Sequence, residues 1–222
     1  MGKNVSFRAD MGFGGNRMPV SVGLTYNAND TFPNEYYVEK GLGYGWRTNL
    51  NQRIYKWTAD LDGDGTVEAS EYYYAWEDGD GTTHYFENVS TGVYTDEDGL
   101  GLTLNISGSD TSMTWTITDK GDNVSYFDTQ GRLYKQENNQ EEKSSIQITY
   151  TADDSYRIST VTDGAGRVYR FTYTDGLLTR VGYYGSTNTE ISGVSLAYEN
   201  GELTRITDPD GKSTTYTYNQ IP

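Results

Sequence analysis

The chain has 222 residues and a formal net charge of −15 at neutral pH. Binding to nucleic acid needs clustered Lys and Arg that neutralise phosphates, so this acidic balance excludes a nucleic-acid-binding protein. The chain contains no cysteine, which excludes disulfides and thiol catalysis. It also lacks a run of about 18 apolar residues, so we expect no membrane span.

The first predicted elements are two apolar or aromatic segments. Residues 19–26 read PVSVGLTY, and residues 41–50 read GLGYGWRTNL. Valine, threonine, tyrosine and tryptophan favour strands over helices. We therefore predict that the chain begins as a β region.

An acidic segment, DLDGDGTVEASE, follows at residues 60–71. Its carboxylates stand at positions 1, 3, 5, 9 and 12, with glycine at position 6, which is the spacing of an EF-hand calcium loop. Five carboxylates in twelve residues repel one another without a counter-ion, so a solvated turn is the weaker interpretation. We expect Ca²⁺ to bind to the Thr66 main-chain carbonyl and to carboxylates, with the last glutamate bidentate. The predicted metal ligands are Asp60, Asp62, Asp64, Thr66, Glu68 and Glu71.

The flanks of this loop predict what the ion does. Residues 53–57 and 72–76 are rich in aromatic residues, which favour strands, whereas an EF-hand has helices on both sides. The loop is therefore predicted to close a hairpin. Without a helix pair to open, calcium is expected to act as a structural clamp and not as a sensor switch.

Catalytic patterns are lacking in the sequence. His84 is the only histidine, and no nucleophile signature stands near it. We predict a packed or surface histidine and no enzymatic activity. Two further acidic segments, residues 77–81 and 96–99, are interpreted as hairpin turns.

A repeat runs through the chain from residue 78. An aspartate is followed eight residues later by an aromatic residue at four places, 41 to 45 residues apart: Asp78 to Phe86, Asp119 to Phe127, Asp163 to Phe171, and Asp208 to Tyr216. A glycine-x-leucine marker recurs at Gly131, Gly176 and Gly201. Recurrence at this spacing indicates one structural unit copied along the chain.

Each copy is predicted to be a turn followed by a strand. Aspartate and glycine supply the turn, and aromatic residues at every second position mark one face of the strand. Asp-Gly at residues 175–176 and Asn-Gly at residues 200–201 favour tight hairpins. Leu203 and Ile206 are three residues apart, so we expect a bulge in that return strand. The fold is thus predicted to be all-β and built of consecutive antiparallel hairpins.

Residues 198–218, YENGELTRITDPDGKSTTYTY, combine a tyrosine-rich strand, G-x-L-x-x-I and a D-x-x-G turn. In this the chain resembles the YD repeat of the Rhs/YD-repeat family, which includes bacterial Rhs and wall-associated toxins, the C component of Tc toxins, and teneurins. Residues 19–26 and 41–50 are similar to what precedes such repeats. The resemblance implies a curved, wound sheet forming part of a shell around a C-terminal toxin or other cargo. Relatives are far longer, so we expect an N-terminal fragment whose partners are other repeats of its parent chain.

Two regions are predicted: residues 1–118, a β region with the calcium-binding hairpin, and residues 119–222, the YD/Rhs-type repeat array. The resemblance implies a non-enzymatic structural segment of a secreted or cell-surface bacterial protein, expected to be Gram-positive because surface proteins there often lack disulfides. The alternative is a calcium-dependent adhesion module that binds a glycan or receptor through exposed aromatic residues. Those residues are Tyr36, Tyr37, Trp46, Tyr183 and Tyr184.

Overall fold

The structure is a computed structural model that describes residues 5–7, 18–27, 40–68, 71–139, 144–153 and 155–218. The regular secondary structure of these residues is almost entirely β-strand, with a 3-10 helix, η2 (Asp110–Ser112), between two strands. The all-β prediction is therefore confirmed. In the described ranges, no helix is long and apolar enough to cross a membrane.

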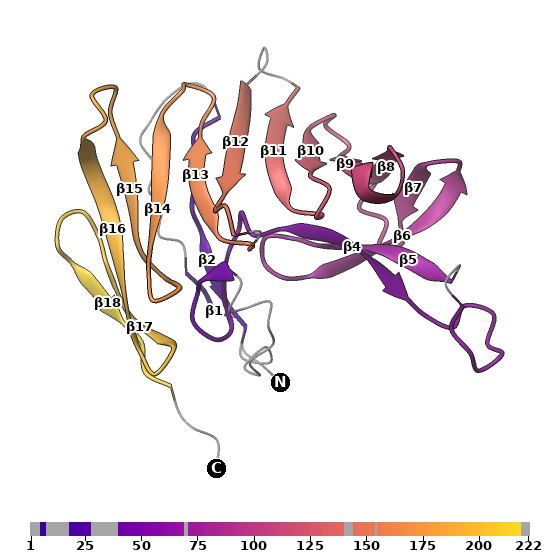
Figure 1. Cartoon of the computed structure of the whole chain (residues 1–222), viewed down its shortest axis with the longest axis horizontal. Helices are drawn as coiled ribbons and strands as arrows, with labels where there is room; N and C mark the ends of the chain where they lie inside the picture. The colour runs from indigo at the N-terminus through magenta and orange to yellow at the C-terminus, as the bar shows by residue number, and fades with distance from the viewer. Residues whose placement is uncertain are drawn as a thin grey trace. The chain divides into compact units, whose positions relative to one another are not determined.

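The strands belong to two antiparallel sheets. One sheet consists of β1 (Val5–Phe7), β2 (Leu24–Tyr26) and β3 (Trp46–Thr48). The other has fifteen strands in sequence order from β4 to β18, so that hairpin follows hairpin as predicted and the sheet remains open (Figure 1). Its strands are β4 (Arg53–Thr58), β5 (Tyr72–Glu77), β6 (Thr83–Ser90), β7 (Val93–Asp96), β8 (Thr103–Ser107), β9 (Thr114–Thr118), β10 (Val124–Phe127), β11 (Leu133–Asn138), β12 (Ser144–Tyr150), β13 (Ile158–Thr162), β14 (Val168–Thr174), β15 (Leu177–Tyr184), β16 (Glu190–Glu199), β17 (Glu202–Thr207) and β18 (Ser213–Thr215).

The chain divides into two compact units, which are described separately. The middle unit is Leu50–Ser145, and the terminal unit combines Met1–Asn49 with Ile146–Pro222. The predicted boundary at residue 118 concerns the sequence repeat and stays a prediction.

In the middle unit, the first strand is bonded to the last hairpin. The Ile54 N–H donates to the Gly131 carbonyl at 2.8 Å, and the Leu133 N–H donates to the Gln52 carbonyl at 3.2 Å. These main-chain bonds fix the Gly131 turn against β4. Apolar side chains fill the core between the strands, among them Ile54, Tyr74, Phe86, Leu104, Trp115, Ile117, Phe127 and Leu133.

In the terminal unit, residues 40–48 pack against the repeat hairpins. The Leu178 N–H donates to the Gly41 carbonyl at 2.6 Å. A Cβ at Gly43 would lie 2.7 Å from the Gly201 carbonyl oxygen and 2.9 Å from the Leu203 nitrogen, so only glycine fits there. Two glycine-x-leucine markers of the repeat therefore serve as contact points for this early segment.

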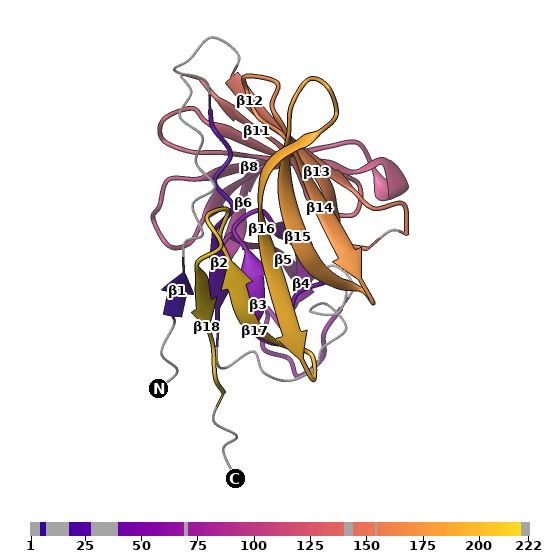
Figure 2. The same ribbon diagram turned by 90° about the vertical axis from the view of Figure 1, so that its left-hand side faces the viewer.

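Trp46 anchors the same contact. Its indole is 1% exposed, its N–H donates to the Tyr218 hydroxyl at 2.8 Å, and its ring centroid lies 5.0 Å from that of Tyr216. Strands β2 and β18 lie close together in Figure 2, and the centroids of the Tyr26 and Tyr218 rings are 5.7 Å apart. Trp46 is therefore a core residue, and its expected role as an exposed binding aromatic was wrong.

Each return strand of the repeat contains a bulge at the same place. The strand pairing shifts by one residue directly after a leucine or isoleucine that is at most 2% exposed. The predicted bulge after Leu203 is confirmed, and it has three equivalents. The pairs at which the shift occurs are Phe127 with Leu133, Tyr150 with Ile158, Tyr173 with Leu178, and Tyr198 with Leu203.

Tyrosine hydroxyls connect neighbouring hairpins at these bulges. Tyr173 donates to the Ile158 carbonyl at 2.9 Å, Tyr198 to the Leu178 carbonyl at 2.9 Å, and Tyr218 to the Leu203 carbonyl at 2.5 Å. Burial raises the pKa of all three phenols, so they stay protonated and donate. The hydroxyl on these rings is thus a structural group, which explains why tyrosine stands there in place of phenylalanine.

Candidate functional site

The acidic loop joins two antiparallel strands, as predicted. It follows β4 and precedes β5, whose last and first residues, Thr58 and Tyr72, are paired. The Ala59 N–H donates to the Glu71 carbonyl at 3.3 Å and extends the hairpin by one step. A loop that binds an ion here would tie the ends of β4 and β5 together.

The first carboxylate of the loop shapes its turn. Asp60 accepts the N–H groups of Gly63 at 2.7 Å and of Gly65 at 2.9 Å. Both glycines have positive φ, 75° and 91°, a conformation that costs other residues strain. The two glycines are therefore required by the backbone path that wraps around Asp60.

The last carboxylate closes the loop from the other side. Glu71 accepts the N–H of Glu68 at 2.9 Å through Oε2, and those of Leu61 at 3.0 Å and Asp62 at 3.1 Å through Oε1. The bond from Glu68 is the main cause that lowers the pKa of Glu71 to about 2, and the bonds from Leu61 and Asp62 lower it further. Glu71 is therefore ionised at neutral pH.

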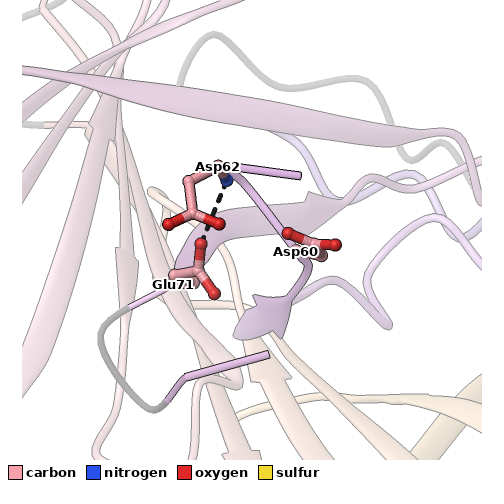
Figure 3. Close-up of side chains that lie close together, drawn as sticks. All are labelled: Asp60, Asp62 and Glu71. Atoms are coloured by element: carbon pink, nitrogen blue, oxygen red, sulfur yellow. Dashed lines mark hydrogen bonds between the residues drawn. The ribbon is translucent and has the colours of Figure 1, made fainter. Parts of the chain in front are cut away.

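Three of the predicted ligands converge. Asp60, Asp62 and Glu71 each offer a carboxylate oxygen, and these oxygens all lie within 4.8 Å of one another. Figure 3 shows the three side chains gathered at the mouth of the loop, with the bond from the Asp62 nitrogen to Glu71. Calcium binds six to eight oxygens at about 2.3–2.6 Å, so the cluster supplies part of such a shell.

The other predicted ligands are engaged with one another. The Thr66 hydroxyl oxygen lies 2.6 Å from a carboxylate oxygen of Asp64 and 2.6 Å from one of Glu68, and it can donate its single proton to either. Hydrogen bonds from the hydroxyl and the main-chain N–H of Thr66 lower the pKa of Asp64. Asp64 and Glu68 thus lie outside the three-carboxylate cluster, and their predicted role as ligands stays a prediction.

His84 is buried, and its surroundings were not predicted. It is 7% exposed, and its ring centroid lies 5.1 Å from that of Trp76. Its Nδ1 lies 2.8 Å from Asp98 and its Nε2 3.1 Å from Asp78. Both ring nitrogens therefore face carboxylates. No sequence spacing marks the partner Asp98, which comes from the next hairpin tip.

The repeat turns are built on one pattern of hydrogen bonds. Asp163 Oδ1 accepts the N–H groups of Ala165 and Arg167, both at 2.9 Å, while the Asp163 N–H donates to the Arg167 carbonyl at 3.0 Å. The main-chain bond recurs at residues 78, 119, 128 and 208. The turn at Asp128 was missed because residue 136, eight positions later, is glutamine and breaks the aspartate-to-aromatic spacing.

These features define the chain as an all-β protein of tandem hairpins closed by aspartate turns. Residues 198–220 match the protein-family model described as RHS Repeat. The resemblance to the Rhs/YD-repeat family, predicted from the tyrosine-rich strand and the D-x-x-G turn, is thus confirmed over these residues. A comparison with curated proteins gave no match.

Proposed function

We propose that this chain is a non-enzymatic structural segment of a secreted or cell-surface YD/Rhs-repeat protein. Its strands form part of a β wall that encloses or displays a toxin or other cargo. Its partners are further repeats of the same parent chain, and Ca²⁺ bound at the acidic loop clamps the β4–β5 hairpin.

One observation supports the wall above all: the strand order follows the chain without interruption from β4 to β18. Each hairpin adds its strands beside the previous ones, so the same step can be repeated without limit. The hydroxyls of Tyr173, Tyr198 and Tyr218 donate hydrogen bonds to main-chain carbonyls of the preceding strand. This arrangement suits a structural wall, because these polar groups of the repeat already have hydrogen-bond partners within the sheet.

The wall is tested by expressing this region within its whole reading frame and digesting the product with a protease. We expect the segment after the repeats to resist cleavage while the wall is intact, and to be degraded once Tyr198→Phe and Tyr173→Phe weaken the hairpin contacts. Cleavage at equal rates in both proteins would count against enclosure.

The calcium clamp is supported by the cluster of Asp60, Asp62 and Glu71, because three carboxylates within 4.8 Å repel one another unless a cation lies between them. With an affinity typical of extracellular modules, about 10⁻⁴ to 10⁻³ M, calcium at about 10 mM would stabilise the fold by about 1.4–2.7 kcal/mol. The melting temperature should then rise by a few degrees.

The measurement is a thermal melt in calcium, in magnesium and in a chelator. Asp62→Asn should lose most of the calcium effect, since the amide keeps the size of the side chain but removes a charge. Glu87→Gln is the matched control, because it removes one charge from an exposed strand position. Equal melting temperatures of the unmodified chain in calcium and in chelator would show that calcium does not stabilise this fold.

A further inference from the structure

A cavity of about 400 Å³ opens between two turns at one end of β14 and β15. The turns join β13 to β14 at residues 163–167 and β15 to β16 at residues 185–189. Val168 pairs with Tyr184 and Arg170 with Gly182, so both turns lie at the same end of the strand pair. The lining includes two guanidinium groups, two phenols and an amide: Arg167, Arg170, Tyr183, Tyr184 and Asn188.

Arg170 is held in place in this cavity without a carboxylate partner. Its guanidinium lies 4.3 Å from the centroid of the Tyr184 ring and donates to the Asn188 side-chain oxygen. Asn188 has a positive φ of 62° within its turn. Five other arginines form ion pairs with carboxylates: Arg53, Arg132, Arg157, Arg167 and Arg180. Among the residues that the structure describes, Arg170 forms no such pair.

The carboxylates near the cavity are already paired. Asp163 accepts from Arg167 at 2.5 Å, and Glu190, which lies 3.3 Å from the Tyr184 hydroxyl, is bound by Arg180. The charge of Arg170 is therefore uncompensated locally, although the chain as a whole has a net charge of −15. A guanidinium has five N–H donors in one plane, and most of those of Arg170 remain available to a ligand.

We infer that this cavity binds a carboxylate-bearing sugar unit, such as a uronic acid in a surface glycan. A carboxylate matches the planar guanidinium of Arg170 and can accept two parallel hydrogen bonds. The phenols of Tyr183 and Tyr184, the Ser186 hydroxyl and the Asn188 amide provide partners for sugar hydroxyls, beside the apolar ring surface that such sites use. Its volume is at the small end of ligand sites, about 300–1,000 Å³, which suits a single ring.

Glucuronate is the probe, and binding is followed by chemical shifts in a ¹⁵N–¹H spectrum of the isotope-labelled chain. We expect the amide signals of Gly166 and Gly185 to shift with saturation in the millimolar range. Glucose, which lacks the carboxylate, and acetate, which lacks the ring, should each bind about ten-fold more weakly. Phosphate binding as tight as that of glucuronate would overturn the inference and indicate a general anion site.

Arg170→Gln should weaken glucuronate binding at least about ten-fold. Arg205→Gln is the matched control, since it removes the same charge from an exposed position on β17 and should leave binding unchanged. Thermal melts establish that both variants fold. Equal loss of binding in the two variants, or no shift at Gly166 and Gly185 in the unmodified chain, would refute the site.

Discussion

The hairpin tip at residues 60–68 and the turn at residues 163–167 both hold an aspartate that accepts main-chain N–H groups, but only the second turn also contains a cation. Asp60 accepts from two glycines, and no Lys or Arg stands between residues 60 and 71. Asp163 accepts from its turn and pairs with Arg167 four residues later. The repeat turn is thus neutralised from within, whereas the acidic loop needs a counter-ion from solution.

The largest effect is expected for Gly131→Ala in a repeat turn. Gly131 has a φ of 76°, and an added Cβ would overlap the carbonyl oxygen of Ile54, the residue whose N–H donates to the Gly131 carbonyl. Gly166 occupies the same turn position with a φ of 79° and open space around it. Urea denaturation should show a loss of about 1–2 kcal/mol for Gly166→Ala, from left-handed strain alone, and a loss of several kcal/mol for Gly131→Ala. Similar losses would mean that the Gly131 turn does not pack tightly on β4.

The next largest loss of stability is expected for Asp163→Ala, which removes the carboxylate paired with Arg167. Asp163 is 3% exposed, so Asp163→Ala removes a buried carboxylate that accepts from the Arg167 side chain and from two turn N–H groups, and it should cost about 3 kcal/mol in urea denaturation. Asp208→Ala is the matched control: Asp208 is only half-buried, and its side chain accepts from the Lys212 N–H. Its loss should cost about 1 kcal/mol. Equal losses of stability in Asp163→Ala and Asp208→Ala would show that the Asp163–Arg167 pair does not stabilise the turn.

In the acidic loop, ionisation of Glu71 should make the stability of the chain depend on pH in the acid range. The pKa of Glu71 is about 2 in the folded chain and 4.5 in the unfolded chain. A lowered folded pKa gives stability that is present above pH 4.5 and is lost as the pH falls towards 2. In a chelator, Glu71→Gln should flatten this part of the curve of stability against pH, and Glu87→Gln should not. A curve of unchanged shape in Glu71→Gln would contradict the assignment.

The smallest effect concerns His84. Burial lowers the pKa of this imidazole, but the hydrogen bonds to Asp98 and Asp78 outweigh it, so the folded pKa lies above the ordinary value of 6.5. The stability from these pairs is complete below pH 6.5 and is lost as the pH rises through the folded pKa. Urea midpoints should therefore fall modestly between pH 6 and pH 8.5. The fall should vanish in His84→Gln, and an unchanged fall would refute the role of this histidine.

The sequence predicted what depends on near neighbours. Alternating aromatics and Asn-Gly or Asp-Gly pairs identified the hairpins, and the spacing of Leu203 and Ile206 identified a bulge, because both are set by the period of a strand. Trp46 could not be placed in this way. Its partners Tyr216 and Tyr218 are about 170 residues away, and a tryptophan in a glycine-rich segment looks alike in a core and on a surface.

For the candidate site, too, the sequence indicated the local pattern but not the contacts that depend on the folded structure. The carboxylate spacing identified Asp60, Asp62 and Glu71, which the hairpin brings together. The contacts of the Thr66 hydroxyl with Asp64 and Glu68 were not predicted, because they depend on the folded shape of the loop and not on the residue spacing. The partner of His84 at Asp98 belongs to another hairpin tip, so no local pattern could indicate it.

The packing of residues 40–48 on the last hairpins determines how the chain can fold. Gly41 is bonded to Leu178, and Trp46 to Tyr218, which a ribosome makes long after residue 46 has emerged. Contacts between such distant parts of a chain form slowly, because a long loop must be closed before they contribute. The hairpins can assemble one after another during synthesis, while Trp46 stays exposed until the last of them is made. This early segment is thus the final piece to lock into the terminal unit and the part most exposed to wrong association before that moment.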